Sequence, residues 1–245
     1  MFGRGSEGGI MGEVVSVTSD FNFNASDSEE YPSSFVYTRK LGGGASYLVG
    51  PYPTAASTAF FPNATPDHIK VVGQMDPSTG VDLQAAVVLS FPAKEGAIAP
   101  AVDDTVEEST PKLPGAGTAL LSYGMLGESS EETTILCTKG RITICSPGHC
   151  PTKLVASLKA TGRGNEGRTI EYDFPLPPDT DEITKAGGFV YPNSAGFCYE
   201  AAAVARCIAA GKMEAPQFTL SETMVSMTVI DEANRQLGTK PVHDS

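Results

Sequence analysis

The sequence has 245 residues, a net charge of −12 at pH 7 and 40% apolar residues. A chain of this length and apolar content can bury a core in one large domain or two small ones. Nucleic acids and anionic membranes are bound by clustered Lys and Arg, so the acidic balance argues against both as partners. No stretch of about 18 apolar residues is present, and the polar residues 1–9 do not resemble a signal peptide. We therefore predict a cytoplasmic protein without a membrane segment.

The cysteines and histidines do not form a recognisable metal site. Five cysteines, an odd number without regular spacing, are typical of free thiols in a reducing compartment. Cys145, His149 and Cys150 lie close together in the sequence, but a structural zinc site takes four ligands. We therefore interpret these three residues as unpaired thiols and a surface histidine, and we predict no metal.

The first quarter of the chain predicts a strand, a loop and a helix. Four apolar residues alternate with polar ones, as in a strand with one apolar face: Val15, Val17, Phe21 and Phe23. Residues 25–35 are polar and contain a proline, which predicts a loop. Residues 45–61 follow the triple glycine 42–44 and are rich in small and apolar side chains, which predicts a buried helix. Because proline has no N–H, this helix should be interrupted near Gly50–Pro51.

From residue 69 onward the pattern predicts a series of strands. The candidates are 69–74, 81–91, 117–125, 133–137, 141–145, 153–159 and 169–174. Consecutive strands without helices between them exclude a parallel βαβ sheet, which needs crossover helices. Residues 93–116 are charged and rich in Pro and Gly, and we interpret them as a loop insertion. We predict an α+β fold, with a large, mostly antiparallel β-sheet and helices packed on one face.

The C-terminal region predicts two amphipathic helices. In the first, apolar side chains recur at helical spacing, and Gly211 follows where a helix end favours glycine. The second begins with a capping box formed by Thr219 and Glu222, and it ends at Gly238. The apolar stripes are Phe197, Ala201, Val204, Ala205 and Ile208 in the first helix, and Leu220, Met224, Met227, Ile230, Ala233 and Leu237 in the second. We predict that both stripes pack into the core of a single domain over residues 1–245.

Neither glycine-rich stretch, 3–9 or 42–44, has the spacing of a dinucleotide-binding turn. Such a turn follows a strand and lets a pyrophosphate approach a helix N-terminus. We therefore predict that the chain binds no NAD or NADP. Tyr47 and Tyr52 follow the triple glycine, and Lys40 precedes it. A Tyr hydroxyl in an apolar pocket can donate a hydrogen bond or act as a general acid, whereas the structural alternative places these rings at the edge of the core.

Four motifs in order point to a known family. They are residues 12–14 (GEV), 41–53 (LGGGASYLVGPYP) and 138–144 (TKGRITI), followed by the two final helices. Together they resemble the C-terminal substrate domain of the glucose-fructose oxidoreductase / inositol dehydrogenase family, closest to its dimeric dihydrodiol dehydrogenase branch. The resemblance implies a homodimer formed through the open face of the sheet. It also implies that the family's Rossmann domain and its Glu-Lys-Pro lysine are missing, so we expect the substrate half without the cofactor half.

The resemblance further implies where the site lies. The family continues its triple glycine with an Asp and, four residues later, a Tyr or His. Here Tyr52 matches the second position, whereas Leu48 replaces the Asp and cannot exchange a proton. We expect a substrate pocket between the sheet and the helix after the triple glycine, with Tyr52 as the catalytic hydrogen-bond donor. Further candidates for substrate contacts are Tyr47, Leu48, Lys40, Phe21 and Phe23, although core packing suits the two phenylalanines equally well.

Because both the family's lysine and its Asp are missing, we do not expect hydride transfer by this chain alone. We hypothesise a cofactor-independent isomerase or cyclase that acts on a small apolar secondary metabolite. A ring closure such as a cycloaddition would need only a shaped pocket and a hydrogen bond from Tyr52. Two alternatives stay open: a non-catalytic binding or scaffolding subunit that partners an intact dehydrogenase, and a truncated oxidoreductase.

Overall fold

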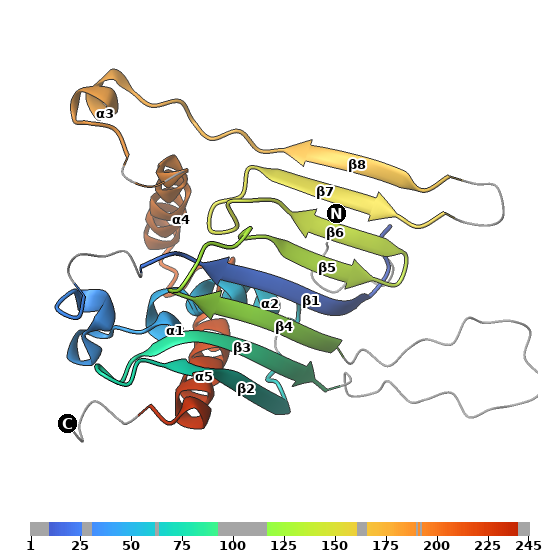
Figure 1. The fold of residues 1–245 in the computed structure, drawn as a ribbon. Helices are drawn as coiled ribbons and strands as arrows, with labels where there is room; N and C mark the ends of the chain where they lie inside the picture. The colour runs from blue at the N-terminus through green and yellow to red at the C-terminus, as the bar shows by residue number, and fades with distance from the viewer. Residues whose placement is uncertain are drawn as a thin grey trace, which may run out of the picture.

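An eight-stranded sheet forms the centre of the fold (Figure 1). The computed structural model describes residues 10–25, 31–61, 64–92, 117–160, 166–189, 191 and 193–239, and the predicted insertion at 93–116 lies outside them. The strands are β1 Val14–Asn22, β2 His68–Met75, β3 Asp82–Phe91, β4 Gly117–Gly124, β5 Thr133–Cys137, β6 Gly140–Ile144, β7 Lys153–Leu158 and β8 Arg168–Asp173. Their order is β2-β3-β4-β1-β5-β6-β7-β8. Only β1 and β4 pair in parallel, which confirms the predicted mostly antiparallel sheet.

Over strands β1 to β4, the described helices cover one face of the sheet and leave the other face open. On β3, Val87 and Leu89 are buried, whereas Val88 between them is exposed. On the neighbouring β4, Leu121 is buried and Leu120 is exposed. This alternation follows from the two-residue period of a strand, and it is typical of an antiparallel sheet with one solvated face.

The predicted helices occur in the predicted order, whereas one short helix and three 3-10 turns were not predicted. The described helices and turns are η1 Phe35–Tyr37, η2 Arg39–Leu41, α1 Ala45–Leu48, α2 Pro51–Phe60, α3 Asp181–Lys185, η3 Ser194–Gly196, α4 Phe197–Ala209 and α5 Leu220–Leu237. Pro51 is the first residue of α2, where its missing N–H costs nothing, and this confirms the predicted interruption. α1, α2 and α5 pack against strands β1 to β4. The covered face of this half of the sheet therefore forms the main core.

The ends of α5 confirm the capping prediction. Thr219 Oγ1 accepts a hydrogen bond from the Glu222 N–H at 3.3 Å, and Glu222 Oε2 accepts one from the Thr219 N–H at 2.7 Å. Gly238 ends the helix in a left-handed conformation. Both sets of free backbone groups are thus satisfied locally, as the sequence motif predicts.

The prediction that both helices pack into the core was wrong for α4. None of its residues is buried, and Phe197 and Ile208 are 63% and 73% exposed. α4 contacts η3 and lies beyond the strand ends rather than over the sheet (Figure 1). In α5, only the second half behaves as predicted, since Ile230 and Ala233 are buried while Leu220 is exposed. Helical spacing identifies an apolar side of a helix, but it does not identify what covers that side.

Candidate functional site

The structure brings together two of the residues that the sequence singled out. Phe21 lies near the end of β1, and Tyr52 lies in the first turn of α2. Their rings are stacked, with centroids 4.6 Å apart and an angle of 20° between the planes. Tyr52 is 47% exposed, so this ring pair forms an open aromatic surface at the end of β1.

The other candidate residues lie elsewhere. Leu48 and Phe23 are partly buried against the core, whereas Tyr47 and Lys40 are exposed. Across the described ranges, no hydrogen bond or ring contact joins any of these four side chains to Tyr52. A role for them in substrate binding stays a prediction.

A histidine–carboxylate pair stands beside the aromatic surface. His149 Nδ1 lies 2.9 Å from Glu131 Oε2, and the two side chains are only 22% and 17% exposed. The His149 ring also lies 5.7 Å from the ring of Phe21 and 6.4 Å from that of Tyr52. The interpretation of His149 as a surface histidine was incomplete, because its side chain is partly buried and lies beside a carboxylate. We refer to Phe21, Tyr52, Glu131 and His149 as the His149 cluster.

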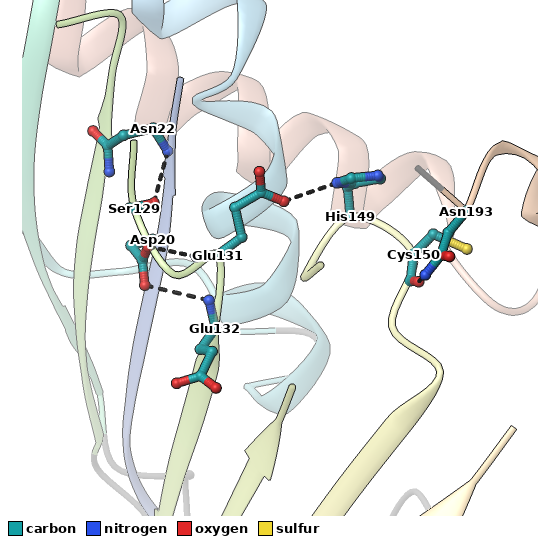
Figure 2. A network of polar contacts seen from close by, with 8 residues as sticks. All are labelled: Asp20, Asn22, Ser129, Glu131, Glu132, His149, Cys150 and Asn193. Atoms are coloured by element: carbon teal, nitrogen blue, oxygen red, sulfur yellow. Dashed lines mark hydrogen bonds and ion pairs between the residues drawn. The ribbon is translucent and has the colours of Figure 1, made fainter. Parts of the chain in front are cut away.

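Glu131 is held in an unusual backbone conformation. Its φ of +52° lies in the left-handed region, which few residues other than glycine adopt. The Asp20 carboxylate accepts hydrogen bonds from the N–H groups of Glu131, at 3.0 Å, and Glu132, at 3.4 Å (Figure 2). Asn22 and Ser129 add a reciprocal pair, in which the Asn22 N–H donates to Ser129 Oγ and the Ser129 N–H donates to the Asn22 carbonyl. The loop before β5 is thus fixed to β1.

The loop that carries His149 is fixed on its other side. A Cβ at Gly148 would overlap the carbonyl oxygen of Glu131, so only glycine allows this close approach. The Asn193 side chain donates a hydrogen bond of 2.9 Å to the Cys150 carbonyl, which joins the loop to the turn before α4 (Figure 2). Three segments that are distant in the sequence therefore hold the imidazole and the carboxylate together.

The triple glycine has a structural use. A Cβ at Gly44 would overlap an oxygen of Asp82, whose other oxygen accepts hydrogen bonds from the N–H and the hydroxyl of Ser46 at 2.7 and 2.8 Å. The Ser46 oxygen lies 3.0 Å from the Tyr123 hydroxyl. Burial raises the pKa of Asp82, and burial together with the nearby Asp82 carboxylate raises that of Tyr123 to about 12, although the Ser46 contact opposes both shifts. The buried Asp82 carboxylate packs against this turn, and its oxygens take up the nearby donors. The turn therefore does not fit the pyrophosphate of a dinucleotide.

Two hollows of the described surface lie away from the cluster. One of about 430 Å³ is lined by Lys212, Met213, Glu214, Pro216 and Thr219, at the connection between α4 and α5. Another of about 290 Å³ lies on β2 and β3 and includes Val72 and Gln84. Between α1 and the sheet, the buried Ala45 and Val49 are part of the core. The exposed ring of Tyr52 therefore makes the His149 cluster a shelf on which a ligand ring could stack.

Among described helices, none is both long and apolar enough to cross a membrane.

The chain is similar to curated dehydrogenases. It is 27% identical over 200 residues to trans-1,2-dihydrobenzene-1,2-diol dehydrogenase of Homo sapiens. The aligned region covers 82% of this chain and 48% of that protein. It is 29% identical over 137 residues to the Sus scrofa enzyme of the same name, and this alignment covers 56% of this chain and 36% of that enzyme. The chain thus spans about half the length, or less, of these relatives.

Two solved structures have the same fold. An aldose-aldose oxidoreductase from Caulobacter crescentus, complexed with glycerol, gives a TM-score of 0.63 at 18% identity and covers 93% of this chain and 54% of that chain. KijD10, a 3-ketoreductase from Actinomadura kijaniata in complex with NADP and TDP-benzene, gives a TM-score of 0.59 at 16% identity. This match covers 93% of this chain and 55% of that chain. At these identities the likeness supports the fold alone.

The family itself is identified by a direct match. Residues 6–143, more than half of the chain, match the family described as the GFO/IDH/MocA C-terminal domain. This match agrees with the four motifs, and the similar proteins above are oxidoreductases. The chain therefore belongs to the GFO/IDH/MocA family, through that family's C-terminal domain.

Proposed function

We propose that this chain is the substrate-recognition part of an oxidoreductase that acts on a ring compound with neighbouring hydroxyl groups. The observation that carries the proposal is the His149 cluster, in which a stacked pair of rings lies beside an imidazole and a carboxylate 2.9 Å apart. Aromatic surfaces favour flat rings, and the polar pair suits hydroxyl groups. The relatives named as dihydrobenzene-diol dehydrogenases act on a compound of this class.

Among the described residues, the glycine-rich turn at 42–44 does not fit the phosphates of a nicotinamide cofactor. The Gly42–Gly44 turn is closed by its own backbone contacts and by the buried Asp82 carboxylate. We therefore assign cofactor binding to another domain or subunit. The role of this chain's residues is to bind and orient the substrate.

The exposed side of α4 suits the docking of that cofactor-binding partner. The exposed apolar residues of α4 are Phe197, Val204 and Ile208, and the exposed Met213, Leu220 and Met224 follow on the connection to α5 and its first turns; we refer to these six residues as the docking surface. α4 itself has only two charged residues, Glu200 and Arg206, although the whole chain carries −12. An apolar patch with few charges is typical of the centre of a protein interface. The surface also begins next to Cys150 and His149, so a docked partner would border the His149 cluster.

The cofactor-independent isomerase or cyclase predicted from the sequence is the second candidate. Catalysis by shape alone favours an enclosed apolar pocket, which would hold a flexible substrate near its reactive geometry. The half-exposed Tyr52 and the adjacent carboxylate instead favour recognition of a hydroxylated ring. Conversion of a substrate by the isolated chain, without a nicotinamide, would favour the cyclase.

We further propose a homodimer that forms through the open face of the sheet. Val88, Leu120, Thr18, Thr134 and Thr143 follow one another across β3, β4, β1, β5 and β6, so an uncharged row crosses five strands. In a chain of net charge −12, such a row suits contact with a second copy. Sedimentation at micromolar concentration should give twice the 25.6 kDa chain mass, and Leu120→Lys should give the monomer. A monomeric native chain would contradict the proposal.

Ligand-observed NMR on the isolated chain tests substrate recognition. The probe is trans-1,2-dihydrobenzene-1,2-diol, and an open shelf should bind it with a Kd of about 1 mM. Tyr52→Ala removes the stacking ring and should weaken binding about fivefold. Tyr191→Ala, another exposed tyrosine, is the matched control and should bind like the native chain. Equal binding by both variants, or no saturable binding by the native chain, would overturn the proposal.

Docking is tested by mixing the chain with the separately produced nicotinamide-binding part of a related dehydrogenase. Ile208→Glu should abolish association, because it places a charge in the docking surface. Leu41→Glu alters a similarly exposed apolar residue in η2 and should leave association unchanged. Equal association of both variants would remove α4 from the interface.

A further inference from the structure

The two edges of the sheet are formed by β2 and β8. The outer backbone N–H and C=O groups of an edge strand can pair with a strand of another chain, and charged side chains on the edge oppose such pairing. Of the six residues of β8, Arg168, Glu171 and Asp173 are charged. β2 has one lysine among its eight residues and two consecutive valines, Val71 and Val72. The side chains of β2 therefore protect its edge less than those of β8 do.

A side chain of α5 occupies the outer edge of β2. The Val71 N–H donates to Gln236 Oε1 at 2.9 Å, and Gln236 Nε2 donates to the Ile69 carbonyl at 2.8 Å. β3 pairs with β2 on the opposite side, so these two backbone groups point away from the sheet. They are groups that the backbone of an added strand would bond. Gln236 therefore takes the place of an added strand at this point of the edge.

Glu232 fixes the orientation of the Gln236 amide. Glu232 Oε1 accepts a hydrogen bond from Gln236 Nε2 at 2.7 Å, and Arg235 donates to both oxygens of the same carboxylate. Hydrogen bonds from Arg235 and Gln236 lower the pKa of Glu232 to about 2, so this carboxylate is ionised at neutral pH. Because an ionised carboxylate only accepts hydrogen bonds, the amide nitrogen must face Glu232, and the amide oxygen is left for Val71.

The end of α5 is held along β2, which fixes the position of Gln236. α5 contacts β2 and lies beside it (Figure 1). Leu237 packs next to Gly73, where a Cβ would lie 2.9 Å from the Leu237 side chain. Thr239 Oγ1 donates to Met75 Sδ at 3.9 Å. The half-buried Gln236 is thus presented to the edge by a fixed element.

We propose that Gln236, oriented by Glu232, is an autoinhibitory contact that closes the β2 edge against antiparallel pairing with β2 of a second copy. The pairing that it prevents has a favourable register. With Val71 opposite Val71 of the second copy, Lys70 lies opposite Val72, whereas a centre one residue earlier would place Lys70 opposite Lys70. Gln236 bonds to Val71, at the centre of the favourable register. The inference is independent of the proposed substrate recognition.

Amide hydrogen exchange in dilute solution tests whether Gln236 holds the edge. Gln236→Leu keeps a side chain of similar size but removes both hydrogen bonds, so the Val71 amide should exchange about tenfold faster. The neighbouring Val72 amide points toward β3 and should change little, which makes it the internal control. Gln236→Ser is too short to reach Val71 and tests the same link without an added apolar group. Unchanged exchange at Val71 in both variants would overturn the inference.

Sedimentation tests whether the uncovered edge pairs. Every variant also carries Leu120→Lys, which places a charge on the open face of the sheet and so opposes association there. Adding Gln236→Leu should double the mass of this parent at about 0.1 mM, as expected for a small interface. Adding Gln74→Leu makes the same change at an exposed residue of β2 and should leave the mass unchanged.

A second substitution identifies the strand that pairs. Val72→Lys, added to Gln236→Leu, should restore the mass of the parent, because it places a lysine opposite Lys70 of the second copy. A parent that stays dimeric contradicts the open-face homodimer only, since edge pairing is measured as a doubling relative to that parent. A mass equal to the parent's for Gln236→Leu at about 1 mM, or a doubled mass that Val72→Lys does not reverse, would overturn the inference.

Discussion

The two halves of the sheet differ in how they use apolar helices. In the half formed by β1 to β4, Val229, Ile230 and Ala233 of α5 are buried, and α5 contacts β2, β3, α1 and α2. Next to the other half, α4 has an equally regular apolar stripe but buries none of its residues. The first half therefore contains the buried core, whereas the apolar stripe of α4 is exposed to solvent in the part of the chain that the structure describes.

This difference separates the stabilising role of a helix from its binding role. A buried apolar side chain contributes about 1.5–3 kcal/mol to folding, while an exposed one leaves that free energy available for binding a partner. The His149 cluster lies where the two halves meet, with Tyr52 on α2 and His149 on the loop between β6 and β7, which Asn193 joins to the turn before α4. The site is thus anchored on the packed half and open toward the other.

Two isoleucines give the largest expected contrast between the halves. Ile230 is fully buried in α5, and Ile208 is 73% exposed in α4. Ile230→Ala should lower the free energy of unfolding by about 3 kcal/mol, because it leaves a cavity beside Gly50. Ile208→Ala should change it by less than about 0.5 kcal/mol. Urea titration measures both variants, and similar losses would mean that α4 is covered in solution.

Two glycines next to the packed half give a smaller contrast. Gly44 has φ 113° and ψ 149°, a region that only glycine adopts readily, and a Cβ there would overlap Asp82. Gly42 has φ 79° and ψ 23° with open space around it. Gly44→Ala should destabilise the fold by about 3 kcal/mol and Gly42→Ala by about 1 kcal/mol.

Thermal unfolding of the two glycine variants checks this ranking. The overlap with Asp82 is the physical difference between them, so the double variant Gly44→Ala, Asp82→Ala should recover part of the loss. Equal melting temperatures for the two single variants would show that Asp82 does not hold the turn.

Most elements of the fold could be predicted because their signals are local. The strand ends fall within a residue or two of the predicted ones, since turn residues mark them, and the capping box of Thr219 and Glu222 fixed the start of α5. The parallel pairing of β1 with β4 could not be predicted, because it depends on where β1 inserts among later strands. The exposure of α4 was missed for a similar reason, since a stripe does not reveal its partner.

The candidate site was predicted only in part. Tyr52 and Phe21 were named from the sequence, and the structure stacks their rings. The pair of His149 and Glu131 was missed, because 18 residues and two strands separate them and no motif links them. The Pro147–Gly148 turn before His149 was the only local signal, and it predicts a turn rather than a carboxylate partner.

Two buried aspartates in the packed half, Asp82 and Asp76, have pKa values shifted in opposite directions. Burial raises the pKa of Asp82, and hydrogen bonds from Ser46 offset this only partly. Burial acts on Asp76 in the same direction, but hydrogen bonds from Thr79, Ser78 and Tyr31 outweigh it and leave the pKa lowered. The two residues lie only six positions apart along the chain, so the sign follows from the balance of burial and hydrogen bonds at each carboxylate rather than from the position in the sequence.

The smallest expected effect is the pH dependence of stability at these two residues. For Asp82, the folded protein holds the proton more tightly than the unfolded chain, so its contribution to stability falls as pH rises from the ordinary value of 3.8 to the raised pKa. For Asp76, the contribution is present above 3.8 and is lost as pH falls through the lowered pKa. Relative to the native chain, Asp82→Asn should therefore gain stability with rising pH above 3.8, and Asp76→Asn should lose it with rising pH below 3.8. Urea titrations at a series of pH values measure both differences, and slopes of the same sign would show that burial alone governs these carboxylates.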